Sequence, residues 1–293
     1  MPIFIQILSL DRRINHHSSF QKSMLPLAEE SSCLTHMSQS IQAPLQPIKL
    51  PEILKSESKN RGIIIAFLII GIWASSLVFL LSLNISKVNF LWLMPVILWQ
   101  AFLYTGLFIT AHDAMHGSVF TQNHKINNLV GALAVFLYGL FDYQQLLKKH
   151  WSHHHHPASE LDPDFHDGKH KNFFAWYFHF MTNYWSWTRL IGLMITFNVI
   201  SYTIHIPEKN LTLFWVLPSI LSSVQLFYFG SFLPHREPEG GHTSIHCAQS
   251  SQLPVFWSFI TCYHFGYHKE HHEYPHVPWW NLPVIYRMQR EIS

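Results

Sequence analysis

The chain has 293 residues, of which 48% are hydrophobic, 15% are aromatic and only 12% are charged. Soluble globular proteins carry about twice that share of charged residues, so a purely aqueous fold is not indicated. The formal net charge of +2 is too small for the concentrated basic surface that a nucleic-acid-binding protein needs, which excludes nucleic acid as a partner.

The first segment, residues 1–61, is rich in serine, glutamine, proline and basic residues, and we predict that it forms a flexible N-terminal tail. After it, four apolar stretches predict membrane-spanning helices in two hairpins. Residues 62–86 and 88–111 carry no charge, and each exceeds the roughly 20 residues that a spanning helix needs. Residues 190–207, of marginal length, and 210–234 form the second pair. The expected fold is an all-α integral membrane protein with about four transmembrane helices.

Two further apolar stretches are expected to lie in or along the membrane without crossing it. Residues 126–141 number only 16, which favours a re-entrant or interfacial helix. Residues 253–267 are apolar and aromatic but interrupted, so we place them along the membrane surface. Lysines and arginines gather in the tail and the large loops, whereas the opposite short links carry only Lys87 and Lys209. The positive-inside rule therefore places the tail and the large loops in the cytoplasm.

Histidine is unusually frequent: its 23 copies exceed the 19 lysines and arginines combined. Three motifs, HDAMH at 112–116, HWSHH at 150–154 and HKEHH at 268–272, have helical spacing, which puts their histidines on one face of a helix. All three lie on the predicted cytoplasmic side, where they can converge. They supply His112, His116, His150, His153, His154, His268, His271 and His272.

Eight imidazoles are too many for one tetrahedral zinc ion, and they suit two metal ions with positions left open for dioxygen. Imidazole accepts zinc, copper and iron, so the residues alone leave the metal open. His235 directly follows a predicted span and is a candidate ninth ligand; the alternative is a histidine that snorkels to the membrane interface. We exclude His155 and His156, which point to other faces of the helix. His246 and His264 lie close enough to the third motif to remain candidates.

Metal-bound histidines commonly donate their second N–H to a carboxylate. Asp113 is the best candidate for this role, because it lies inside the first motif at the end of a span, where an unpaired carboxylate is costly. Other nearby acids are equally well explained as helix caps or solvated charges. They are Asp142, Asp162, Asp164, Glu270 and Glu273.

The three motifs resemble those of the membrane fatty-acid desaturase and hydroxylase superfamily. Longer stretches resemble the bacterial-type β-carotene ketolases (4-oxygenases) over roughly residues 60–285. These stretches are FLYTGLFITAHDAMHGSVF, LLKKHWSHHHHPASELDPDFH, LFYFGSFLPHR and TCYHFGYHKEHHEYPHVPWW. The resemblance implies that residues 62–293 form a catalytic domain of this type, with a cytoplasmic-face site that holds two iron ions (Fe²⁺).

The resemblance further implies O₂-dependent oxidation of β-carotene at C4 of the β-ionone ring, to echinenone or canthaxanthin. Two hydroxylations at one carbon give a gem-diol, which loses water to the ketone. Electrons are expected from a separate carrier such as ferredoxin, because the chain has neither a glycine-rich dinucleotide motif nor a CxxC motif. The carotenoid is expected to bind in an aromatic-lined cavity. Its candidate lining residues are Phe141, Tyr143, Trp151, Trp176, Tyr177, Trp185, Phe227, Tyr228, Tyr263 and Phe265.

Two kinds of alternative remain at this point. Another oxidation in the same superfamily, carotenoid ring hydroxylation or fatty-acyl desaturation, would use the same three motifs. A membrane metal-binding or transport protein would instead be expected to place its ligands near the middle of the spans. The motifs lie at the predicted edges of the spans, which favours an oxygenase over a transporter.

Overall fold

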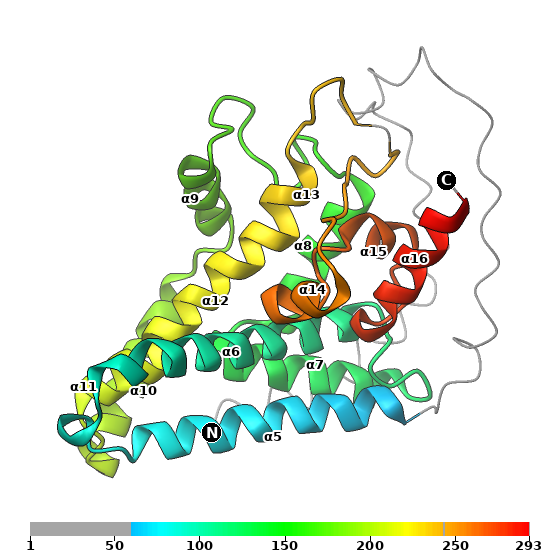
Figure 1. Ribbon diagram of the computed structural model, residues 1–293. Helices are drawn as coiled ribbons and strands as arrows, with labels where there is room; N and C mark the ends of the chain where they lie inside the picture. The colour runs from blue at the N-terminus through cyan, green and yellow to red at the C-terminus, as the bar shows by residue number, and fades with distance from the viewer. Residues whose placement is uncertain (1–59, 243, 293) are drawn as a thin grey trace.

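The computed structural model describes residues 60–242 and 244–292, so nearly all of the predicted tail lies outside the described residues (Figure 1). Within that range the chain forms helices and turns and no strand, which confirms the all-α prediction. The first hairpin consists of α5 (Arg61–Leu81) and α6 (Leu93–Met115). Two short 3-10 turns, Ile85–Lys87 and Phe90–Trp92, connect them.

The predicted re-entrant segment is the helix α7 (His124–Gly139). It is followed by α8 (Tyr143–His155), and the two helices are bent by 100° at a short break. Leu140 makes the break possible with a left-handed backbone (φ 55°), and the side chain of Asp142 then caps α8 by accepting the N–H of Gln145. Asp142 is thus a helix cap.

The next part of the chain contains two shorter helices and one long one. The shorter helices are α9 (Phe173–Asn183) and α10 (Trp187–Ile204). The long helix runs from Glu208 to His235 and is interrupted by two π turns. It comprises α11 (Glu208–Leu211), a π turn (Thr212–Val216), α12 (Leu217–Phe227), a second π turn (Tyr228–Phe232) and α13 (Leu233–His235).

Among the described residues, three helices are long and apolar enough to cross a membrane: α5, α6 and the helix Glu208–His235. The bent pair α7 and α8 makes a fourth if it counts as one broken span. The predicted span at 190–207 corresponds to α10, which is not among them because Arg189 and Asn198 interrupt its apolar sequence.

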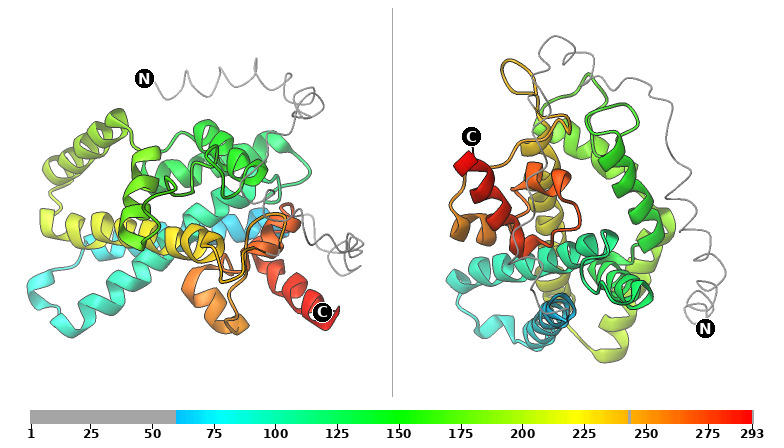
Figure 2. Two further views of the ribbon diagram at one scale, coloured as in Figure 1. Left: turned by 90° about the horizontal axis from the view of Figure 1, so that it is seen from above. Right: turned by 90° about the vertical axis from the view of Figure 1, so that its right-hand side faces the viewer.

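Helix α6 lies at the centre of the fold and contacts α5, α7, α8, α12 and α14 (Val255–Cys262). Its side chains explain this position: Tyr104, Leu107, Ile109 and Ala111 have no exposed surface. The C-terminal segment adds α15 (His268–Glu273), a 3-10 turn (Trp279–Asn281) and α16 (Leu282–Ile292). These orange and red segments gather at one side of the molecule (Figure 2).

A buried amide ties the long helix to the first hairpin. Asn210 is 2% exposed, and its Nδ2 donates to the carbonyl oxygens of Leu81 and Leu83, at 3.1 and 2.7 Å. Leu81 is the last residue of α5 and Leu83 follows it, and at this end a helix lacks partners for its own C=O groups. Asn210 therefore fixes where the two elements meet at the end opposite the histidines.

We predict that Asn210→Ala lowers the free energy of unfolding by about 1–3 kcal/mol, because it leaves these carbonyls without donors. Thermal or denaturant unfolding in detergent measures the loss. Asn198→Ala is the control, since the exposed Nδ2 of Asn198 donates only within its own helix, to Met194 O at 2.7 Å, and should change stability by less than about 0.5 kcal/mol. Equal losses in the two variants would contradict the proposed tie.

Candidate metal centre

The first motif lies where α6 ends. His112 is in the last turn of α6, and His116 is the residue that caps it. Between them, Asp113 places Oδ1 3.4 Å from Nδ1 of His112, and its Oδ2 accepts the backbone N–H of Trp279 at 3.0 Å. Asp113 is 3% exposed. The carboxylate thus links the first motif to the 3-10 turn that precedes α16.

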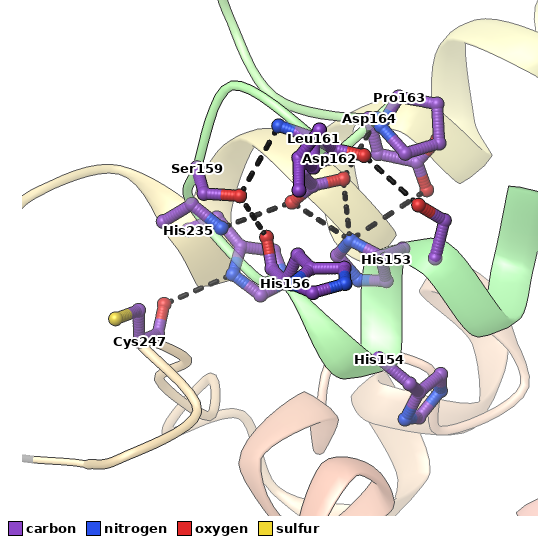
Figure 3. A network of polar contacts seen from close by, with 12 residues as sticks. His153, His154, His156, Ser159, Leu161, Asp162, Pro163, Asp164, His235 and Cys247 are labelled. Carbon is purple, nitrogen blue, oxygen red and sulfur yellow. Dashed lines mark hydrogen bonds and ion pairs between the residues drawn. The ribbon is translucent and has the colours of Figure 1, made fainter. Parts of the chain in front are cut away.

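The second motif occupies the C-terminal turns of α8, which is oriented by the bend after α7. His150, His153 and His154 follow one another on the inner side of this helix, and His153 is 1% exposed. Nδ1 of His153 lies 2.9 and 3.0 Å from the two carboxylate oxygens of Asp162 (Figure 3). Asp162 belongs to the loop that leaves α8, so this motif supplies its own carboxylate partner.

The third motif forms the short helix α15, whose three histidines are 1–3% exposed. Tyr263 and His264, both with positive φ (47° and 62°), reverse the chain between α14 and α15. His235 ends the long helix, directly after the second π turn. Its Nδ1 donates to the carbonyl oxygen of Cys247 at 2.9 Å (Figure 3).

All nine histidines singled out in the sequence come together in two groups. Within each group, one ring nitrogen of every histidine lies within 4.8 Å of the others. Group one consists of His112, His116, His150, His154 and His271. Group two consists of His153, His235, His268 and His272. The groups adjoin, because the rings of His154 and His272 stack at 4.3 Å.

Hydrogen bonds among the imidazoles cannot provide a partner for every buried ring nitrogen of group two. Nε2 of His272 lies 3.1 Å from Nε2 of His153 and 3.0 Å from Nε2 of His268. One ring nitrogen carries either a proton or a lone pair, so only one of these two contacts can be a hydrogen bond. Nε2 of His235 is also buried and has no hydrogen-bond partner in the described part of the chain. A cation that all four nitrogens face would remove the conflict.

Group one also brings ring nitrogens close together, here in two separate pairs. Nε2 of His116 lies 2.6 Å from Nε2 of His150, and Nε2 of His154 lies 2.9 Å from Nε2 of His271. Nε2 of His112 is buried and has no hydrogen-bond partner within residues 60–242 and 244–292. Two nitrogens bound at right angles to one ion, each about 2.1 Å away as in zinc sites, lie about 3.0 Å apart. The observed spacings therefore fit transition-metal ions in both groups.

The protonation of the third motif favours metal binding. Burial, and next the neighbouring imidazoles, lower the pKa of His268, His271 and His272 well below the usual range. A lowered pKa favours the neutral ring, which is the form that coordinates metal. Neither group contains a carboxylate or a thiolate. An all-imidazole donor set suits zinc, copper, iron or nickel rather than magnesium or calcium.

The two groups differ in their access to solvent. The four histidines of group two are 1–3% exposed. In group one, His116 and His154 are half-buried, and the half-buried Trp151 packs against them, 5.2 Å from the ring of His116. Group one therefore lies at the edge of the site and group two at its interior.

The excluded His155 and the remaining sequence candidates lie outside both groups. His155 is exposed, His246 approaches only the ring of His272 at 5.8 Å, and His264 packs among aromatic rings. Glu270 accepts a hydrogen bond from Ser250, and Glu273 pairs with Lys269 at 3.8 Å. Two further contacts of the site could not be predicted from the sequence: the carbonyl of Cys247 and the N–H of Trp279. Both are backbone groups, which nearly every residue type carries.

An aromatic ring contacts both groups from the side of the helical core. The ring of Phe265 lies 4.8 Å from that of His112 and 5.2 Å from that of His268. It packs against Gly230 in the second π turn, where an added Cβ would lie 2.2 Å from Cε1 of Phe265. Only glycine allows this approach. Phe265 therefore closes the site on its apolar side.

We predict that Gly230→Ala displaces Phe265 and with it the third motif, so that activity and bound metal both fall. Phe265→Leu in the Gly230→Ala background should restore part of both, because the smaller side chain leaves room for the methyl group. Metal content and turnover of the single and double variants measure this. Failure of the second change to restore either quantity would contradict the contact.

The carboxylate next to His112 gives a second prediction. Asp113→Asn should weaken turnover more than Glu270→Gln, because Asp113 faces a candidate ligand whereas Glu270 accepts from Ser250. The comparison is balanced, since each change removes one charge from a side chain that is 3% exposed. Equal loss of turnover in the two variants would undermine the assigned role of Asp113.

The fold and the site define a class: an all-helical protein with several candidate membrane spans and two adjoining clusters of imidazoles. Comparison with known proteins shows to which family of that class the chain belongs. A family model described as fatty acid desaturase matches residues 90–207 and 182–293. The chain therefore belongs to the fatty acid desaturase family.

Three relatives illustrate this placement. The β-carotene 4-ketolase 3 of Haematococcus lacustris is 36% identical over 79% of this chain and 80% of its own length. The zeaxanthin 4-ketolase of Chlamydomonas reinhardtii is 38% identical over 78% of this chain, which spans about half (54%) of that relative. The β-carotene ketolase of a Paracoccus species (strain PC1) is 42% identical over 62% of this chain and 74% of its own length.

Proposed function

We propose that this protein is an O₂-dependent carotenoid 4-ketolase that converts β-carotene to echinenone or canthaxanthin. The observation that carries the proposal is the pair of imidazole groups in a chain whose relatives named as ketolases share 36–43% of its residues. An sn-1 oleoyl-lipid 12-desaturase from Arthrospira platensis is only 24% identical, which favours ketolation over desaturation. The two groups hold one ion each, and we propose iron for both.

Bound iron would supply redox chemistry that activates dioxygen at the open positions of the site. His112, His116, His150, His154 and His271 would hold one ion, and His153, His235, His268 and His272 the other. Asp113 and the carbonyl of Cys247 orient His112 and His235 through their Nδ1 atoms, which leaves Nε2 of each free to bind metal. Metal-bound histidines are commonly oriented in this way.

The rest of the site suits an apolar substrate. Phe265 separates the imidazoles from the helical core, and Tyr263 and Phe102 stack behind it at 4.4 Å. A carotenoid offers no charge to bind, so aromatic surface must recognise it. The ring methylene at C4 is allylic, so removal of a hydrogen there gives a radical delocalised into the polyene. We place the histidines on the cytoplasmic side, in agreement with the loop charges.

The reaction balances as two hydroxylations at the same carbon. Each uses one O₂, two electrons and two protons, replaces a C–H bond by C–OH and releases one water. The resulting gem-diol loses a further water to give the ketone. The electrons must come from outside the chain, and we propose a soluble one-electron carrier of the ferredoxin type.

Expression in a bacterium that accumulates β-carotene tests the function. We expect echinenone and canthaxanthin in the extracted pigment, identified by chromatography and mass spectrometry, because a ketone in conjugation also reddens the colour. Single alanine variants of His112, His150, His153, His268 and His271 should make no keto product, since loss of a ligand removes metal or redox control. Hydroxylated carotenoids or altered lipid unsaturation instead of ketones would overturn the proposal.

A further inference from the structure

One carboxylate stands out among the side chains that surround the two groups. Asp162 is 5% exposed, and both of its oxygens lie within 3.0 Å of Nδ1 of His153. The corresponding distance from Asp113 to His112 is 3.4 Å. His235 has only a backbone carbonyl as its partner. Of the nine histidines, His153 therefore has the closest carboxylate contact among the described residues.

The carboxylate of Asp162 is itself held in place by the backbone. Its Oδ1 accepts the N–H of Asp164 at 2.8 Å, and its Oδ2 accepts the N–H of Ala158 at 3.0 Å. Each oxygen thus accepts one backbone donor as well as facing His153 (Figure 3). Two acceptor oxygens are required, which an aspartate provides and an asparagine does not.

The loop that carries Asp162 is anchored from several sides. Ser152 in α8 donates to the carbonyl of Leu161 at 2.9 Å. Trp176 and Asn183 in α9 donate to the carbonyls of Asp164 and Pro163, each at 2.8 Å. Hydrogen bonds from α8 and α9 therefore hold the loop, and with it the carboxylate of Asp162, in place.

We infer that Asp162 is the positioning residue of group two: it holds Nδ1–H of His153 and so presents the bare Nε2 of that ring to the ion shared with His235, His268 and His272. This inference rests on the proposed metal site. The site then depends on two carboxylates: Asp113, which faces His112, and Asp162, which faces His153. In this role Asp162 acts through His153.

The test is the metal content of the full-length protein purified in detergent and loaded anaerobically with iron(II). The Asp162→Asn variant keeps the size of the side chain but turns an N–H₂ group toward a backbone N–H or toward Nδ1 of His153. We expect its affinity for one of the two ions to fall by about 10- to 100-fold, with the other ion retained. Chelator competition measures this, and the spectrum of the remaining iron should match that of His153→Ala.

Asp167→Asn is the matched control. Asp167 lies in the same loop and also faces an imidazole, with Oδ2 2.7 Å from Nδ1 of His170, but that pair is exposed and belongs to neither group. This variant should bind both ions with wild-type affinity. A fall equal to that of Asp162→Asn would show a general effect of loop charge and would overturn the inference.

A second variant covers the case in which Asp162→Asn does not fold. Asp162→Glu keeps both acceptor oxygens but displaces them by one methylene, so its affinity for the second ion should lie between those of wild type and Asp162→Asn. If the variant that folds, Asp162→Asn or Asp162→Glu, binds both ions with wild-type affinity, the positioning role of Asp162 is refuted. If both ions bind but no keto product forms in wild type, the proposed reaction fails while the positioning role stands or falls on the affinities alone.

Discussion

The structure depends on one constraint: nine imidazoles are packed so that their ring nitrogens face one another, and hydrogen bonds among them cannot satisfy every nitrogen. In water each nitrogen would have its own hydrogen-bond partner. Here Nε2 of His272 lies within hydrogen-bond distance of two other imidazole nitrogens, whereas Nε2 of His112 and Nε2 of His235 have no hydrogen-bond partner among the described residues. Burying polar atoms in this way is costly unless something binds them. The free energy of metal binding would offset the cost of burying these nitrogens.

Four helical segments must meet for the groups to form, and the long helices do the positioning. Helix α6 packs against α12 in the middle of the helix Glu208–His235, which fixes how these two helices are oriented relative to each other. The bend between α7 and α8 then brings the second motif back over the helix ends that carry His112 and His235. Helix α15 is too short to be stable alone, and its place is set by the contacts of Phe265 and by α16.

Contacts outside the two groups connect the imidazoles to distant parts of the chain. Asp113 reaches the backbone of Trp279, Asp162 is fixed by the loop after α8, and His235 is bonded to the carbonyl of Cys247. The site is therefore not a property of three short motifs. A change in α9 or in the segment before α16 reaches the metal ligands through these bonds, since each sets the orientation of one ring.

The sequence by itself determined the helical class, three strongly apolar spans and the histidines that could act together, because hydropathy and helical spacing are local properties. It could not divide the nine histidines into two groups, since consecutive residues such as His153 and His154 fall into different groups. It also ranked Asp113 above Asp162, because only the fold shows which carboxylate reaches an imidazole at 2.9 Å. Tertiary structure decided these points, since they depend on where separate helices end relative to one another and on backbone groups that no side-chain pattern reveals.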